Sequence, residues 1–273
     1  MSLSTEYPNV QIIGEPNGLR NCYIESRVHG LFACLYCIIY GFYICEKENL
    51  NGIVRMGEEH LYYEKSYGEN VFDYFFTQEK DAHASITIRV TNPFPFLRWG
   101  HISAFDKIRA NSIIKRELHL RPEIQKIIVN FKKKNFCGGN MLGVHYRGRD
   151  KRNEVAILPF KYYVEKIDEI LNKKICERIF FSTDELSLRE VIASKYKDKV
   201  IMYELEADTT DSRLTPHEGL HINSKTPYLQ GKDALIEMYL LSSCTLLLSS
   251  YSSSMSIFST YINPNLIHIP LEI

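Results

Sequence analysis

A dense group of charged side chains follows an apolar run near the middle of the chain. The run Met141–Val144 has the composition of a buried strand, and a His, two Arg, an Asp and a Lys follow it within residues 145–151. Ligands of open α/β sheets bind outside the carboxyl ends of the strands. Because a guanidinium group can fork onto two phosphate oxygens, Arg147 and Arg149 together predict a diphosphate site. Taken alone, the segment fits a solvated loop with weak surface ion pairs equally well.

Three further polar groups favour a ligand site. Residues 182–185 (Ser-Thr-Asp-Glu) and the serine-rich residues 249–254 each follow an apolar run, and hydroxyl groups at a helix N-terminus offer donors to an anion. Asp233 and Glu237 are four residues apart on a predicted helix, where a carboxylate in a pocket can accept from the N1–H and N2–H groups of guanine. Each group alone also fits an N-cap, an ordinary loop or a solvated helix face. Because all of them fall near carboxyl ends of predicted strands, they jointly predict a nucleotide pocket.

The second half of the chain alternates between strand and helix patterns. We expect strands at 141–144, 178–181, 199–203, 246–248 and 266–269, and helices at 159–171, 186–195, 233–243 and 255–261. Such alternation indicates a parallel, doubly wound sheet. A sheet of this kind brings the polar groups described above to one edge.

The first half is also α/β, with a more irregular middle. We expect a strand at 10–13, a turn-rich loop at 14–18, a helix at 24–46, strands at 53–56 and 85–90, and a helix at 120–134. The lysine-rich helix end at 132–134 and the pair Gly138-Gly139 form the best candidate boundary. The chain is therefore expected to form two domains, 1–137 and 138–273.

Composition limits the possible functions. The 273 residues are 45% apolar and 24% charged, as in an ordinary globular protein, and 33 Lys and Arg balance 33 Asp and Glu. A nucleic-acid partner is not expected, because it needs a basic surface. The apolar stretch 30–45 is shorter than the ~20 residues of a membrane-spanning helix, so a buried helix is the better interpretation than an anchor.

The cysteines and the amino-terminal sequence indicate the cellular compartment. Seven cysteines without framework spacing predict reduced, buried thiols. Cys34 and Cys37 match C-x-x-C but lie in an apolar run, which argues against metal or redox chemistry. The first residues lack the basic and apolar regions of a secretory signal, so a cytoplasmic location is expected.

The polar groups resemble the motifs of a known enzyme family. Residues 145–151 (His-Tyr-Arg-Gly-Arg-Asp-Lys) resemble the H-x-R-x-x-D-K segment of the α1,6-fucosyltransferases, the nodulation fucosyltransferases and, more distantly, the protein O-fucosyltransferases. Residues 182–185 are similar to the second motif, an apolar strand ending in S/A-T-D-D/E, and residues 237–253 to the third. Gly18–Cys22, followed by a long apolar helix, resembles a degenerate N-terminal glycine-rich loop of the family. The resemblance is specific over the second half of the chain and loose over the first.

The resemblance implies a fold and a reaction. These families have the GT-B fold, in which two Rossmann-like domains face a cleft, with the acceptor side in the N-terminal domain and the nucleotide sugar in the C-terminal one. The expected activity is inverting transfer of fucose from GDP-fucose to a glycan hydroxyl, as in glycan biosynthesis, without a metal or another cofactor. The alternatives are a related inverting transferase that uses another sugar nucleotide, such as UDP-xylose, and a non-catalytic nucleotide-sugar-binding protein.

The resemblance also assigns roles to single residues. Arg147 is expected to stabilise the leaving diphosphate. Glu154 is expected to be the catalytic base, although the gap between the Asp-Lys pair at 150–151 and this Glu is one residue shorter than in the family. Glu237 is the expected guanine contact, and Ser253 matches a serine that contacts phosphate. The residues expected to bind the donor are His145, Arg147, Arg149, Lys151, Asp184, Glu237, Ser252 and Ser253.

The departures from the family pattern concern the identity of the transferred sugar more than the type of reaction. Gly148 stands where the α1,6 enzymes have a second Arg, and Glu237 replaces the usual Asp. The N-terminal half is short, and its aromatic residues are better explained as core or interdomain packing than as platforms for sugar rings. These aromatic residues are Tyr62, Tyr63, Phe72, Tyr74, Phe75 and Phe76.

Overall fold

The chain folds into two compact units, Met1–Pro122 and Glu123–Ile273. The computed structural model describes residues 7, 9–14, 20–26, 30–78, 83–91, 107–136, 138–148, 158–206, 227–250 and 252–271. The units divide one helix earlier than the boundary expected at 137 and 138. The reason is that helix α5 (Pro122–Asn135) packs with the second unit, where the ring of Phe131 contacts the rings of Phe180 and Tyr203.

The second unit is built on a five-stranded parallel sheet. In chain order, its strands are β7 (Met141–Tyr146), β8 (Arg178–Thr183), β9 (Val200–Ile201), β10 (Leu246–Ser250) and β11 (Ile267–Leu271). They are arranged in the order β11-β10-β7-β8-β9, and every neighbouring pair is parallel. The chain order reverses beside β7, so a crevice is expected at the carboxyl ends of β7 and its neighbours.

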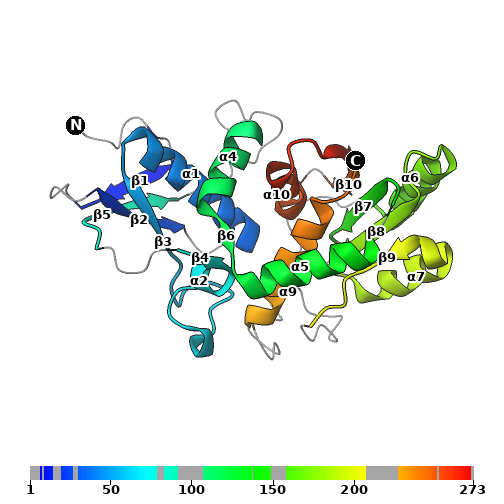
Figure 1. The fold of residues 1–273 in the computed structure, drawn as a ribbon, viewed down its shortest axis with the longest axis horizontal. Helices are drawn as coiled ribbons and strands as arrows, with labels where there is room; N and C mark the ends of the chain where they lie inside the picture. The colour runs from blue at the N-terminus through cyan, green and yellow to red at the C-terminus, as the bar shows by residue number, and fades with distance from the viewer. Residues whose placement is uncertain are drawn as a thin grey trace. The chain divides into compact units, whose positions relative to one another are not determined.

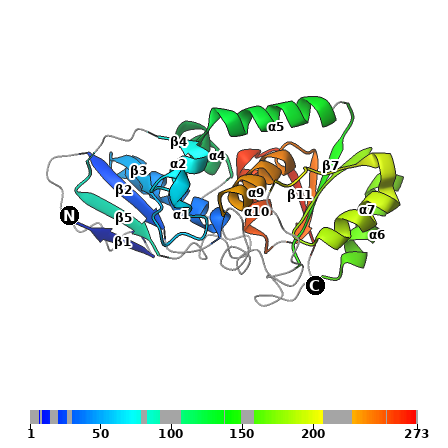
Figure 2. The same ribbon diagram turned by 90° about the horizontal axis from the view of Figure 1, so that it is seen from below.

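Helices cover both faces of this sheet (Figure 1). Figure 2 shows α6 (Phe160–Asn172) and α7 (Leu186–Tyr196) on one side, and α9 (Pro227–Leu241) and α10 (Ser254–Ile262) on the other. Alternate strand residues such as Val144, Phe181 and Leu248 pack against α6 and α7 in one apolar core. The residues between them face α9 and α10, and this is the side that carries the polar groups. The doubly wound sheet expected for the second half is confirmed.

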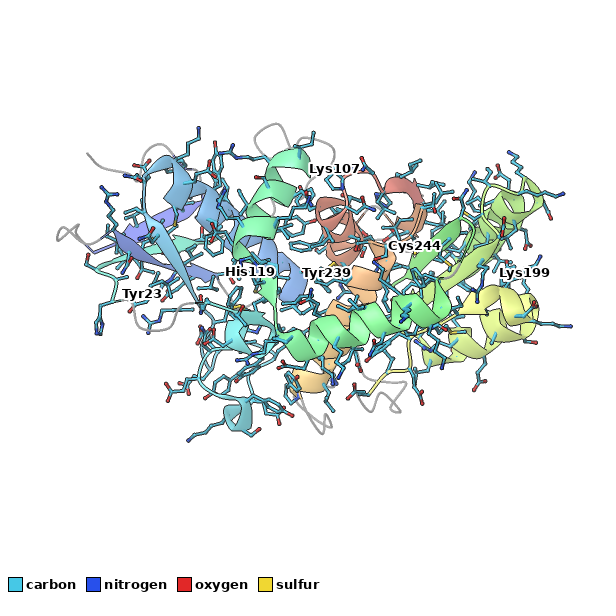
Figure 3. All side chains as sticks on the ribbon, viewed as in Figure 1. Tyr23, Lys107, His119, Lys199, Tyr239 and Cys244 are labelled. Atoms are coloured by element: carbon cyan, nitrogen blue, oxygen red, sulfur yellow. The ribbon has the colours of Figure 1, made fainter. Side chains whose placement is uncertain are left out.

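Gly143 of β7 lets helix α9 approach the sheet closely. A side chain at this position would lie 3.1 Å from Sγ of Cys244, the residue labelled in Figure 3 that follows the end of α9. Cys244 Sγ in turn donates to the carbonyl oxygen of Leu240 at 3.5 Å. This close contact holds the buried side of α9, which carries Glu237, against β7 and β8.

The first unit contains a four-stranded sheet of order β1-β5-β2-β3. Its strands are β1 (Val10–Ile13), β2 (Asn21–Ser26), β3 (Asn51–Arg55) and β5 (Ile86–Val90). Strand β2 is parallel to β3 and β5, whereas β1 is antiparallel to β5. Helix α1 (Leu31–Lys47) connects β2 to β3, so the βαβ unit begins with β2.

Two expectations for this unit are therefore wrong. The helix begins at Leu31 rather than at residue 24, because residues 21–26 form a strand with alternating burial. The glycine-rich loop was expected at 18–22, but Asn21 and Cys22 already belong to that strand, and residues 15–19 lie outside the described residues. The chain passes from β2 to α1 through residues 27–30, of which Gly30 is the described N-cap.

The described part of the first unit also contains a further helix, α4 (Lys107–Glu117). Its shorter elements are the 3-10 turn η2 (Lys65–Tyr67), α2 (Phe72–Phe75), β4 (Phe76–Thr77) and β6 (His119–Leu120). Of the aromatic residues considered above, Tyr62, Phe72, Tyr74, Phe75 and Phe76 are buried, as expected for core residues, and Tyr63 is half-buried.

The cysteines follow the sequence expectation where they can be described. Six of them are free and buried, and the seventh, Cys137, lies outside the described residues. Within the described ranges, no three His, Cys, Asp or Glu side chains are grouped so that they could hold a metal ion. The part of the chain with assigned structure also contains no helix that is both long and apolar enough to cross a membrane.

Candidate functional site

A row of three polar residues crosses the carboxyl edge of the second sheet. His145 of β7 is in register with Ser182 of β8 on one side and with Ser249 of β10 on the other. All three are buried, and the apolar residues before them fill the core. Because parallel strands end at the same edge, the sequence pattern of apolar run followed by polar group becomes one continuous polar surface. The predicted convergence of these groups is confirmed.

His145 is fixed in its neutral form between β7 and α10. Its Nδ1 lies 2.7 Å from Oγ of Ser256 and 3.1 Å from Oγ of Ser253. Burial, and to a smaller extent the nearby charge of Arg147, lowers the pKa of His145 to about 3. A neutral imidazole held by two hydroxyl groups can accept or donate a hydrogen bond at physiological pH, but it adds no charge to the site.

Ser253 connects this histidine to the start of helix α10. It is the N-cap residue, and its Oγ accepts from the backbone N–H of Ser256 at 3.3 Å. The expected N-cap role of the serine-rich segment is therefore confirmed for Ser253. Ser252 lies one residue earlier and is half-buried, with its Oγ 3.3 Å from that of Ser250.

Replacing Ser253 by Ala should destabilise the protein by about 1 kcal/mol, the usual cost of a lost N-cap. The conservative variant Ser253→Thr keeps the accepting oxygen and should lose much less. Denaturant unfolding followed by circular dichroism measures both. Equal free energies of unfolding for wild type and Ser253→Ala would contradict the cap.

Arg147 and Gly148 follow the end of β7 and lie on the side of the neighbouring strand β8. Arg147 is half-buried and directly follows β7, and its charge lowers the pKa of His145. The N–H of Gly148 donates to Oδ1 of Asp184 at 3.1 Å. Asp184 follows β8 directly, so its carboxylate ties the segment carrying Arg147 to the neighbouring strand.

Two side chains lie close to Gly148. A Cβ atom at this position would overlap the carboxyl oxygen of Glu185, which is the end of a flexible side chain, and would lie 2.8 Å from the ring of Tyr146. In the resembling α1,6 enzymes an Arg stands at this position. A larger residue at position 148 would therefore require the carboxyl group of Glu185 to move.

Glu237 points from α9 to the same edge and is almost completely buried. Its Oε2 accepts from Oγ of Ser182 at 2.9 Å, and its Oε1 lies 3.6 Å from Nη1 of Arg189. Burial raises the pKa of Glu237 to about 7, against the opposing effects of Arg189 and Ser182, while Asp233 and Asp184 raise it further. The alternative of a solvated helix face is therefore wrong for this residue, whose side chain is only 9% exposed.

Further charged groups connect α9 to the segment after β9. Oδ2 of Asp233 accepts from the backbone N–H of Glu206 at 2.8 Å, and Nζ of Lys232 lies 2.7 Å from Oε2 of Glu206. Burial, together with the nearby carboxylates, raises the pKa of Tyr203. Asp233 lies on the same helix face as Glu237 and is also buried. Its carboxylate holds the segment that follows β9 at this end of the sheet.

The structure brings together six of the residues predicted from the sequence. His145, Arg147, Asp184, Glu237, Ser252 and Ser253 all lie at the carboxyl edge of the second sheet or at the helices packed beside it. The other three, Arg149, Lys151 and Glu154, lie outside the described residues, so their roles stay predictions.

Sequence reasoning missed Arg189 and Ser256. Arg189 is the fourth residue of α7, close to the positive end of that helix, where a cation is normally unfavourable. This violation of a local rule was the available signal, because such exceptions concentrate at functional sites. Ser256 carries no comparable signal, since serine in the first turn of a helix is common.

The first unit has a separate polar hollow on its sheet. Figure 3 labels Tyr23, whose ring is covered by the guanidinium of Arg55 at 4.4 Å, and Arg89 is paired with Glu25 at 2.7 Å beside it. Asp73 of α2 also lines the hollow. These side chains already bind one another, so we assign no ligand to this hollow.

The two α/β units, one with a doubly wound parallel sheet and a polar carboxyl edge, define the fold class. It is the GT-B fold, as the sequence resemblance implied. Among solved structures, the chain is similar to NodZ alpha-1,6-fucosyltransferase soaked with GDP-fucose, with a TM-score of 0.57 and 15% identity over 89% of this chain and 92% of that one. Fucosyltransferase NodZ from Bradyrhizobium gives a TM-score of 0.56 and 14% identity over 90% and 92%.

A plant enzyme gives a similar result. A variant of FUT1 from Arabidopsis thaliana in complex with GDP has a TM-score of 0.54 and 11% identity, over 88% of this chain and 68% of that one. No family model matches the sequence, and no curated protein matches it. At these identities the likeness establishes the fold, and the chemistry has to be argued from the residues.

Proposed function

We propose that this chain is a fucosyltransferase that binds GDP-fucose in its second unit and transfers fucose to a hydroxyl group of a glycan. The observation that carries the proposal is the polar row His145, Ser182 and Ser249, with Arg147 directly after it and the buried carboxylate of Glu237 beside it. The fold supports the proposal, because the similar solved structures hold GDP or GDP-fucose.

The proposed mechanism is inverting and needs no metal ion. The bond between the fucose anomeric carbon and the diphosphate oxygen breaks, while the acceptor oxygen attacks the opposite face of the sugar. Positive charge develops on the sugar ring and negative charge on the leaving GDP. Arg147, assisted by Arg149 and Lys151, stabilises the diphosphate, and Glu154 takes the proton of the acceptor hydroxyl.

The remaining residues position the donor. The hydroxyl groups of Ser252 and Ser253 and the N-terminus of α10 suit a phosphate, because backbone N–H groups converge there. His145 contributes a neutral hydrogen-bonding group, and Asp184 holds the backbone that carries Arg147. Glu237 is assigned to binding the guanine base of the donor, as the resemblance implies.

Calorimetric titration with GDP-fucose, GDP, UDP-xylose and UDP, in buffer containing EDTA, tests this proposal. We expect GDP and GDP-fucose to bind without added metal and the uridine nucleotides to bind more weakly. Tighter binding of UDP-xylose would favour the related transferase instead, and a strict requirement for Mn²⁺ would contradict the mechanism.

The variant Glu154→Gln separates an enzyme from a binding protein. It should bind GDP-fucose as the wild type does, since Glu154 is assigned to the acceptor proton, but it should lose transfer to a glycan acceptor. A wild-type protein that binds GDP-fucose and neither hydrolyses nor transfers it would indicate the non-catalytic alternative.

A further inference from the structure

We propose that Arg189 is a base-selecting residue, which donates to a carbonyl oxygen on the edge of the donor base while Glu237 accepts from the ring N–H next to it. The inference rests on the proposed function, because it takes the nucleotide to lie at this edge of the second sheet. It adds a residue from α7 that none of the motifs contains.

Arg189 and Glu237 each present one buried atom without a hydrogen bond. Within the described part of the chain, Nη1 of Arg189 has no acceptor and Oε1 of Glu237 has no donor, although both atoms are shielded from solvent. Buried polar atoms are nearly always hydrogen-bonded, whereas these two have only each other, as an ion pair that is too long for a hydrogen bond. Two such atoms side by side therefore indicate a ligand that supplies both partners.

The other atoms of these two groups are already held by the protein. Oε2 of Glu237 accepts from Ser182, and Nη2 of Arg189 donates to the backbone oxygen of Tyr203. Within the described residues, Oε1 of Glu237 and Nη1 of Arg189 are the acceptor and the donor of this pair that have no hydrogen bond, and they lie 3.6 Å apart. This separation exceeds an ordinary hydrogen bond, and it allows each atom to reach one of two neighbouring groups on a ring edge.

The elements place this pair where a base can lie. Arg189 comes from the first turns of α7 on one face of the sheet, and Glu237 comes from α9 on the other face. They meet beyond the carboxyl end of β8, where Ser182 of the polar row contacts Glu237. A nucleotide whose phosphates lie near Arg147 at the end of the adjacent strand β7 would extend its base in this direction.

The remaining donor and acceptor match one class of base edge. Guanine and hypoxanthine present a carbonyl oxygen beside a ring N–H, so the oxygen can accept from Arg189 and the N–H can donate to Glu237. Adenine presents an amino group beside a bare ring nitrogen, which would set donor against donor and acceptor against acceptor. Uracil has the same pattern as guanine, so the pair excludes adenine by chemistry and leaves the choice between guanine and uracil to the size of the pocket.

The test compares base preference in the wild type and in Arg189→Met at pH 8, where Glu237 is ionised. GDP, IDP and ADP are titrated by calorimetry, and the preference is the ratio of the dissociation constants of ADP and GDP. We expect the wild type to bind GDP and IDP about tenfold to a hundredfold more tightly than ADP. In Arg189→Met this ratio should fall toward one, with GDP and IDP weakened together.

Arg178→Met is the matched control. Arg178 lies at the amino end of β8 and donates to the backbone oxygen of Asn135 at 2.8 Å, so the control loses the same kind of bond away from the site. It should keep the wild-type ratio. If Arg189→Met does not fold, Arg189→Lys replaces it, because an ammonium group keeps the charge but lacks the planar, forked donors that let Arg189 face Tyr203 and the nucleotide base at once.

The outcomes separate the inference from the proposed function. An unchanged ratio of ADP to GDP affinities in a folded Arg189 variant would overturn the role of Arg189 and leave the proposed function standing. A wild-type protein that binds none of the nucleotides would overturn both. A loss of stability in Arg189→Met without a change in the ratio would show a structural role only.

Discussion

Replacing Arg147 by Ala should slow fucose transfer by about 10²–10³-fold, the loss seen when one group that stabilises a developing negative charge is removed. The side chain follows β7 at the polar row, and in the proposed mechanism it faces the leaving diphosphate. Charge on that group grows in the transition state, so the effect should fall mainly on kcat rather than on KM for GDP-fucose.

Steady-state kinetics with saturating acceptor measures this effect. Arg147→Lys should retain part of the rate, because an ammonium group keeps the charge but not the two-pronged contact. Arg178→Met again serves as a control, since Arg178 lies at the amino end of the neighbouring strand β8 and its guanidinium binds the backbone oxygen of Asn135 there. A rate near that of the wild type in Arg147→Ala would remove Arg147 from the mechanism.

Replacing Glu237 by Gln should weaken GDP binding by about a hundredfold, because hydrogen bonds to charged groups contribute about 1.5–3 kcal/mol. If the amide oxygen keeps the bond to Ser182, the amide N–H₂ group faces the ring N–H of the base, and two donors then oppose each other. Titration of GDP at pH 8 measures the loss, and unchanged affinity would contradict the assignment of Glu237 to the base.

The same variant should be more stable than the wild type at high pH. Burial raises the pKa of Glu237 to about 7, so between pH 4.5 and pH 7 the folded protein keeps a proton that the unfolded chain has released. Wild-type stability therefore falls as the pH rises through this range, whereas the Gln variant lacks the effect. The stability of Glu237→Gln relative to the wild type should increase by about 2–3 kcal/mol from pH 5 to pH 8.

Glu169→Gln is the control for this pH dependence. Its hydrogen bonds to Lys166 and Lys173 lower the pKa of Glu169 to about 2, so this exposed carboxyl is ionised in both states from pH 5 to pH 8. The difference between Glu169→Gln and the wild type should not change over that range. Unfolding curves at several pH values measure both variants, and parallel curves for Glu237→Gln and the wild type would contradict the raised pKa.

The sequence predicts the second unit well because its three central strands, β7, β8 and β10, are largely buried. Apolar runs such as Met141–Val144 and Ile179–Phe181 end where charged or hydroxyl residues begin, so both the strand and the site at its end are visible. Strand β2 was not predicted, because only some of its residues are apolar and because the long apolar sequence of α1 follows it closely. Period-two burial of six residues is a weak signal beside a long apolar helix.

The sequence pattern does not predict contacts between helices that are far apart in the chain. The spacing of Asp233 and Glu237 indicates a shared helix face, but it does not show that α9 is buried almost all round. The meeting of Arg189 with Glu237 depends on α7 and α9 lying on opposite faces of one sheet and reaching past its edge. Such a contact follows from tertiary packing and leaves no local pattern.

The row Ser249, His145 and Ser182 also restricts where the chain can change its length. Successive strand residues face opposite sides of a sheet, so deleting one residue within β7 would turn His145 toward the apolar core and bring Tyr146 to the polar side. Insertions and deletions in this unit should therefore survive only in the segments between strands and helices. A length series between Gly148 and Pro159, which includes Glu154, is the natural place to vary the distance between the catalytic base and the acceptor.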